Sequence, residues 1–289
     1  MPCLVQSSYM ANAVRKITLS QRRNILFTAC KHQVYVWVPS GASEMINSSP
    51  EMIITPVMKN PRASGYILPR SPHAINNILV DDLGCDEVLV LATDSGNVCA
   101  YHVEAICSAL EWAAEFDQER PLDDSYIHPF FTEYVGMSAW GLAIHKFARL
   151  IAVSANTHQI TVFAFAIVDP SGSGECGGAL EASTGDEDYD YDHTWEVVDS
   201  PEKLAELRQR LDFSKIRSRN IRLTYKGHNT NIPTVSFFNT DIDPNGNWLL
   251  STDIDNRVIV WKLWSHLCPY NVNSLNTMTD RLSPPHLIE

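Results

Sequence analysis

One short phrase occurs four times along the chain, and its repetition constrains the fold more than any other feature. Each copy has small or hydroxyl residues, then a polar turn, then an alternating apolar run that ends in an aromatic residue. The four closing aromatic residues are Trp37, Tyr101, Phe163 and Trp261. The first three are 64 and 62 residues apart, and the last interval is 98 residues long. A regular period of this kind predicts an architecture built from similar units.

Strand-like runs precede each closing run. Four of them lie directly upstream, at residues 25–29, 87–93, 150–155 and 247–252, and each forms a predicted hairpin with the closing run. A further strand is expected before each hairpin, at 14–20, 74–80, 139–145 and 234–238, and a fourth strand at 51–57 and at 221–225. Four short strands per unit are typical of β-propeller blades. A β-sandwich is the alternative, but it would not need the same phrase in every unit.

The fourth unit, Lys226 to Trp261, resembles a WD repeat. It has Gly227-His228 at its start, a Pro-Asn-Gly turn, Ser251-Thr252, Asp255 and the closing Trp261. In this pattern we expect a buried hydrogen-bond chain that joins Trp261, a hydroxyl group at Ser251 or Thr252, His228 and Asp255, and that locks the strands of the blade. The other three units have Lys31, Ser95 and Thr157 in place of Asp255, which indicates degenerate blades.

A serine, a histidine and an aspartate together could also indicate a hydrolase triad. The structural lock is the favoured interpretation, because the blade pattern already accounts for all three residue types and no Gly-x-Ser-x-Gly motif holds the serine. The seven cysteines include no Cys-x-x-Cys pair, which favours free thiols in a reducing compartment over disulfides or zinc. The sequence therefore predicts no catalytic, metal-binding or cofactor-binding residue, and no cofactor.

These patterns together predict an all-β fold: a WD-repeat-type β-propeller with four recognisable blades. The expected blades span about 14–57, 74–136, 139–225 and 227–264, and residues 265–289 are expected to form a polar C-terminal tail. An acidic disordered insertion and a short helix are expected at about 169–220. Because WD-type propellers generally need more than four blades, we expect an incomplete propeller whose missing blades come in cis or from a partner chain.

The charge and hydropathy of the chain exclude some partners. A formal net charge of −12 argues against direct nucleic-acid binding over the whole surface. No apolar run is long enough to cross a membrane, and the first residues lack a signal-peptide core, so we expect an intracellular location with no membrane partner. The acidic residues 175–202 are interpreted as a solvated loop or as a site for a basic partner. The basic run 215–222 is either a nuclear-import or nucleic-acid patch or a set of charges paired within the protein.

Long connections at 38–50, 102–129 and 166–220 are the expected sites of contact with protein partners. A helix is predicted to begin with Ser200 as its N-cap, either packed on the propeller or free to bind a partner. A second helix is predicted around 105–112, with Trp112 in the core. The aromatic-rich residues 126–134 either cover a blade face or form a recognition site.

Two segments, His128 to Phe165 and Ile75 to Tyr101, resemble a fungal family of WD-repeat-like regulators of ribonucleotide reductase gene transcription. The resemblance extends from about Val14 to Trp264. It implies a non-enzymatic scaffold, nuclear or cytoplasmic, that acts through protein contacts in deoxynucleotide supply and the DNA damage response. The alternative function is a substrate receptor of a cullin-type ubiquitin ligase. Against that alternative, Lys-Leu-Trp follows Trp261, without the aspartate and arginine of the usual adaptor-binding motif.

Overall fold

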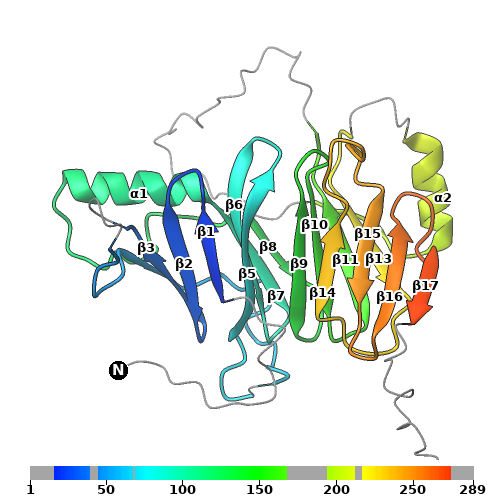
Figure 1. Ribbon diagram of the computed structural model, residues 1–289, viewed down its shortest axis with the longest axis horizontal. Helices are drawn as coiled ribbons and strands as arrows, with labels where there is room; N and C mark the ends of the chain where they lie inside the picture. The colour runs from blue at the N-terminus through cyan, green and yellow to red at the C-terminus, as the bar shows by residue number, and fades with distance from the viewer. Residues whose placement is uncertain (1–15, 40–44, 68, 168–193, 212–216, 275–289) are drawn as a thin grey trace, which may run out of the picture.

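The computed structural model describes residues 16–39, 45–67, 69–167, 194–211 and 217–274, which form four β-sheets and two helices (Figure 1). The first sheet has the strands β1 (Ile17–Ser20), β2 (Ile25–Cys30), β3 (Gln33–Trp37) and β4 (Met52–Ile54). The second has β5 (Ile75–Leu83), β6 (Asp86–Thr93), β7 (Asn97–His102) and β8 (Phe131–Tyr134). The third has β9 (Ala139–His145), β10 (Leu150–Ala155), β11 (Gln159–Ala164), β12 (Glu196–Val198) and β13 (Ile221–Lys226). The fourth has β14 (Thr234–Phe237), β15 (Trp248–Thr252), β16 (Arg257–Lys262) and β17 (Asn271–Ser274).

Each sheet is built around four antiparallel strands. In the first, second and fourth sheets the strand order follows the chain, and every neighbouring pair is antiparallel. In the third sheet β13 takes the fourth place beside β11, and β12 adds a parallel edge strand outside it. The all-β prediction is therefore confirmed, with four-stranded antiparallel sheets as the repeated unit.

Strands with a mainly apolar sequence lie where the sequence places them. The predicted runs at 139–145 and 150–155 coincide with β9 and β10, and the fourth strands expected near 51–57 and 221–225 are β4 and β13. The structure adds three strands that the sequence did not suggest, β8, β12 and β17. The last of them, β17, lies inside the expected polar tail. It was not predicted because Asn271 to Ser274 pair with β16 through their backbones and need no apolar pattern.

The four sheets lie side by side in chain order (Figure 1). The first strand of each sheet contacts the first strand of the next, so β1 meets β5, β5 meets β9 and β9 meets β14. Within the described residues, β14 and β1 make no comparable contact. The four sheets therefore form an open series and not a closed ring.

One packing rule holds at all three junctions between sheets. We call the face that carries the closing aromatic residue the aromatic face of a sheet, and the other its plain face. Tyr101 packs in a core shared with the plain face of the first sheet, Phe163 with that of the second, and Trp261 with that of the third. Every junction thus joins the plain face of one sheet to the aromatic face of the next.

The two helices arise from long connections that follow closing aromatics. The helix α1 (Val103–Glu115) buries Ile106 and Leu110 in the core between the first and second sheets. The helix α2 (Pro201–Arg210) begins as predicted, since the Ser200 side chain accepts a hydrogen bond from the Lys203 amide, and it packs Leu204 on the third sheet. The prediction that Trp112 belongs to the core is wrong: the helix begins earlier than expected, and its buried stripe leaves Trp112 outside.

Candidate functional site

A buried polar chain joins the strands of the fourth sheet. The indole N–H of Trp261 donates to Ser251 Oγ at 2.7 Å, and Ser251 Oγ lies 2.7 Å from His228 Nε2. His228 Nδ1 in turn lies 2.8 Å from Asp253 Oδ2. Because the indole nitrogen can only donate, the serine proton points to His228 Nε2, and a neutral imidazole donates from Nδ1 to the carboxylate. Each proton along this chain therefore has one acceptor.

The carboxylate of this chain belongs to Asp253, and the sequence prediction of Asp255 is wrong. Asp253 stands just before the turn between β15 and β16, where its Oδ1 also accepts from the amides of Asp255 and Arg257 at 3.1 and 2.9 Å. Asp255 lies in the exposed turn itself. Of the two hydroxyl candidates Ser251 is the one used, since Thr252 lies on the opposite face of the strand. His228, Ser251 and Trp261 are brought together as predicted.

Burial fixes the protonation states of this network. Burial lowers the pKa of His228, although the hydrogen bond to Asp253 acts in the opposite direction. Burial alone would raise the pKa of Asp253, but hydrogen bonds from His228 and from the Arg257 amide hold it below its usual value. The network therefore pairs a neutral imidazole with an ionised carboxylate at neutral pH.

The order of serine, histidine and aspartate matches that of a hydrolase triad, but its surroundings differ. A nucleophilic serine must meet the carbonyl carbon of a substrate. Ser251 is only 1% exposed, and its oxygen already accepts the indole proton of Trp261, which is fully buried. This geometry joins strands and offers no surface to a substrate.

Related but simpler contacts occur in the first two sheets. Trp37 donates through its indole N–H to Thr28 Oγ1 at 2.9 Å, without a histidine. In the second sheet His73 Nδ1 lies 2.8 Å from Ser95 Oγ. By strand register Thr93 occupies the place of Asp253, and its Oγ1 accepts from the Asn97 amide at 3.0 Å. The next residue, Asp94, accepts from Ser138 Oγ at 2.7 Å, which links the second sheet to the segment just before the third.

In the part of the chain that the structure describes, the two ends of the series present sheet faces that no other sheet covers. The aromatic face of the first sheet exposes Ile17 and Leu19, which are 62% and 47% exposed, beside the half-buried Trp37. The plain face of the fourth sheet carries Leu250, 42% exposed, beside its cross-strand neighbour Val260. These two faces are of the two kinds that pair at every internal junction.

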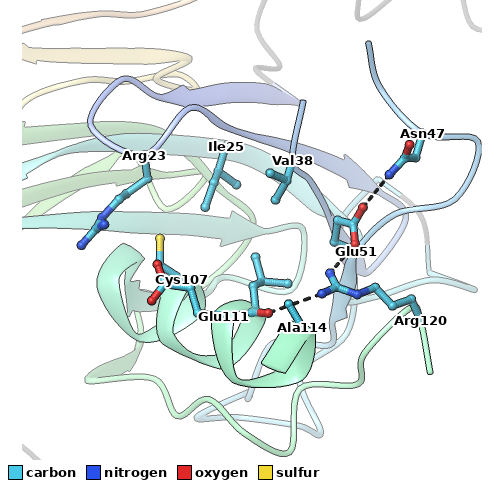
Figure 2. Close-up of a pocket in the computed structure, with 10 residues that line it drawn as sticks. Arg23, Ile25, Val38, Asn47, Glu51, Cys107, Glu111, Ala114 and Arg120 are labelled. Carbon is cyan, nitrogen blue, oxygen red and sulfur yellow. Dashed lines mark hydrogen bonds and ion pairs between the residues drawn. The ribbon is translucent and has the colours of Figure 1, made fainter. Parts of the chain in front are cut away.

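A groove of about 410 Å³ lies between α1 and the first sheet (Figure 2). Its two arginines are engaged in ion pairs: Arg23 with Glu104 on α1, and Arg120 with Glu51. Burial raises the pKa of the Cys107 thiol to about 11, so this lining thiol is protonated at neutral pH. The groove therefore offers neither an unpaired arginine nor a reactive thiolate.

Much of the basic run at 215–222 is used inside the protein, as far as the structure describes it. The buried Arg217 donates through Nε to the carbonyl of Phe165 at 2.9 Å. Arg222 donates to the carbonyl of Tyr134 at 3.0 Å and lies over the Phe163 ring. These contacts support the internal role for both arginines, while Lys215 and most of the acidic insertion lie outside the described residues.

Neither a metal site nor a membrane span is found in the described part of the chain. No group of three or more histidine, cysteine, aspartate or glutamate side chains there is arranged to hold a metal ion. Neither helix has the length and apolar character needed to cross a bilayer.

Comparison with known proteins places the chain in a family. A family model described as CRT10 matches residues 7–264. The chain belongs to the CRT10 family. This confirms the resemblance to the family of constitutive regulators of ribonucleotide reductase transcription.

Comparisons with curated proteins and with solved structures identify no further family. A search of curated proteins found no match. Among solved structures, one match is a chain from a crystal structure of the mitotic checkpoint complex, with 12% sequence identity and a TM-score of 0.45. The match covers 92% of this chain and 52% of that chain, so this chain spans about half the length of the chain it matches.

Proposed function

We propose that this CRT10 chain is a non-enzymatic, WD-repeat-type propeller scaffold that regulates ribonucleotide reductase genes through protein contacts. The family match over residues 7–264 is the observation that carries the regulatory role. A regulator of transcription acts in the nucleus, and the DNA damage response is the setting in which deoxynucleotide supply must change. Direct DNA binding is not part of the proposal, because the net charge of −12 disfavours contact with phosphates.

The scaffold role is supported by what the buried polar chain does. Its serine, histidine and aspartate are used to hold β15 and β16 to the segment before β14, and Ser251 has no open side. Binding surfaces on a rigid β framework usually lie on its loops and uncovered faces. The long connections and the two end faces are therefore the proposed contact surfaces.

The proposal includes further blades that cover the two end faces, supplied by the rest of a longer chain or by a partner. The packing rule supports a definite polarity for them. A blade added beyond the fourth sheet would lay its aromatic face on Leu250 and Val260, and a blade added before the first would lay its plain face on Ile17 and Leu19. Covering these apolar side chains removes their surface from water, which favours association.

A deletion and complementation experiment tests the regulatory role. In the source organism, deletion of the gene is expected to change ribonucleotide reductase transcript levels, measured with and without a DNA-damaging agent, while unrelated transcripts stay constant. The wild-type gene is expected to restore the wild-type level, and so is Thr252→Ala, whose side chain lies outside the lock. Unchanged ribonucleotide reductase transcripts after deletion would refute the regulatory role. If the purified protein had a hydrolytic activity, and if variants lost regulation only when they also lost that activity, the non-enzymatic role would be refuted.

A further inference from the structure

An exposed aromatic patch lies on α1 and on the connection that follows it. We propose that Trp112, Phe116 and Tyr126, the α1 patch, bind a basic, arginine- or lysine-bearing segment of a partner protein. The Trp112 ring centroid lies 5.3 Å from that of Phe116 and 4.8 Å from that of Tyr126. The three residues are 37%, 56% and 48% exposed. The inference deepens the scaffold role proposed above, on which it rests, by giving the chemistry of one partner.

The patch is not needed by the core of the protein. Helix α1 packs on the sheets through Ile106, Leu110 and Ala113, which recur at helical spacing on one side. Trp112 and Phe116 are four residues apart and therefore lie together on another side of the same turn. Tyr126 joins them from the connection to β8. Clusters of exposed aromatic residues are typical of contact surfaces, where tryptophan and tyrosine contribute much of the binding energy.

The charges around the patch select the partner. The segment 103–127 contains seven acidic residues and one basic residue, Arg120. Arg120 does not offset them at the surface, because it is paired with Glu51 and also donates to the Leu110 carbonyl. Of these seven acids, six form no ion pair within the described residues: Glu111, Glu115, Asp117, Glu119, Asp123 and Asp124. Glu111 lines the groove near Arg23, whereas Glu115, three residues after Trp112, lies on the same side of the helix as that ring.

The combination of rings and carboxylates suits a guanidinium or ammonium group better than any other ligand. A cation over the Trp112 or Tyr126 ring gains a cation–π contact, and an adjacent carboxylate such as Glu115 accepts its hydrogen bonds. Asp123 stays ionised, since hydrogen bonds from the Ser125 hydroxyl and amide lower its pKa. The same carboxylates would repel the phosphates of a nucleic acid or of an anionic membrane.

A peptide selection on the purified full chain tests this inference directly. Random displayed peptides are selected on the wild-type protein, and the affinities of individual winners are measured by fluorescence anisotropy at low and high salt. We expect the winners to be rich in arginine or lysine and to bind more weakly at high salt. Trp112→Ala and Glu115→Lys are each expected to weaken binding by about 10-fold or more. Tyr66→Ala, which removes a similarly exposed aromatic residue elsewhere, should leave binding unchanged.

Several outcomes would overturn the inference. They are a selection without winners, winners that lack basic residues, and equal affinities for Trp112→Ala and wild type. Because both substituted side chains are exposed, the variants are expected to keep the wild-type urea unfolding curve. Should one variant unfold, the other decides the result. A failed selection with altered transcripts in the deletion strain would remove this site and leave the regulatory role intact.

Discussion

Removing the Ser251 hydroxyl is expected to be among the most destabilising small substitutions in the fourth sheet. Ser251→Ala deletes the atom that both accepts from Trp261 and donates to His228. Two buried polar groups, the indole N–H and the imidazole Nε2, then lose their partners. A buried group left without a hydrogen bond costs about 1–3 kcal/mol, so the free energy of unfolding should fall by about 2–6 kcal/mol.

The matched controls are the two residues that the sequence pattern also suggested for the lock. Thr252→Ala and Asp255→Ala change side chains outside the network, and each should cost about 0.5 kcal/mol or less. Urea unfolding gives these free energies, and amide hydrogen exchange of β16 localises the loss to the fourth sheet. In the double variant Ser251→Ala/Trp261→Phe the indole donor is absent, so the two costs should not add. If Ser251→Ala were no more destabilising than Asp255→Ala, the proposed network would be refuted.

Three further outcomes follow from buried geometry. The free energy of unfolding should fall as the pH drops below about 6.5, because burial lowers the pKa of His228 in the folded protein and only the unfolded chain then takes up the proton. His228→Gln should reduce this pH dependence, and an identical slope in urea titrations would contradict it. Gly96→Ala should lower the free energy of unfolding far more than Gly84→Ala, although both glycines have positive φ. A Cβ at Gly96 would lie 1.4 Å from the Gly136 oxygen, whereas a Cβ at Gly84 would lie 3.2 Å from its nearest neighbour, a side-chain atom of Arg149. Equal unfolding midpoints for the two variants would count against this packing. A fluorophosphonate probe should leave Ser251 unmodified, as judged by mass spectrometry, since its oxygen is buried, and labelling would revive the hydrolase interpretation.

The strands that could be predicted are those with a mainly apolar run of strand length. Such runs occupy 139–145 and 150–155, where β9 and β10 have the same bounds and every residue is buried. By contrast β12 lies within the long connection 166–220, and β17 contains three polar residues among four. Both join their sheets by backbone pairing, which leaves little trace in side-chain hydropathy.

The polar network shows how far a motif can locate individual residues. The pattern identifies His228, Ser251 and Trp261, but it places the carboxylate two residues too late. The available signal was a polar residue four places before the third strand of the unit, Thr93 in the second sheet and Asp253 in the fourth, whose side chain accepts from the amide of that strand's first residue. An aspartate just before a tight turn satisfies the turn amides, which favours that place over the turn itself.

The position of Trp112 could not be predicted because it depends on where a helix starts. A helix of 13 residues beginning at Val103 buries residues on one side only, and the sheets beneath it decide which side that is. The exposed tryptophan and the surrounding acids are consequences of that orientation. The sequence predicts Trp112 in the core, and for the aromatic residues 126–134 it leaves a surface recognition site as one of two alternatives.

The two end faces of this open series of sheets are the proposed contact surfaces. Size-exclusion chromatography with light scattering, followed by urea unfolding of the same sample, measures whether they associate. We expect the 289-residue chain to self-associate as its concentration rises, and Leu250→Lys on the uncovered plain face of the fourth sheet to reduce this association. A monomer at every concentration, with one cooperative transition and no effect of Leu250→Lys, would contradict the proposal and would mean that the four sheets are complete without further blades.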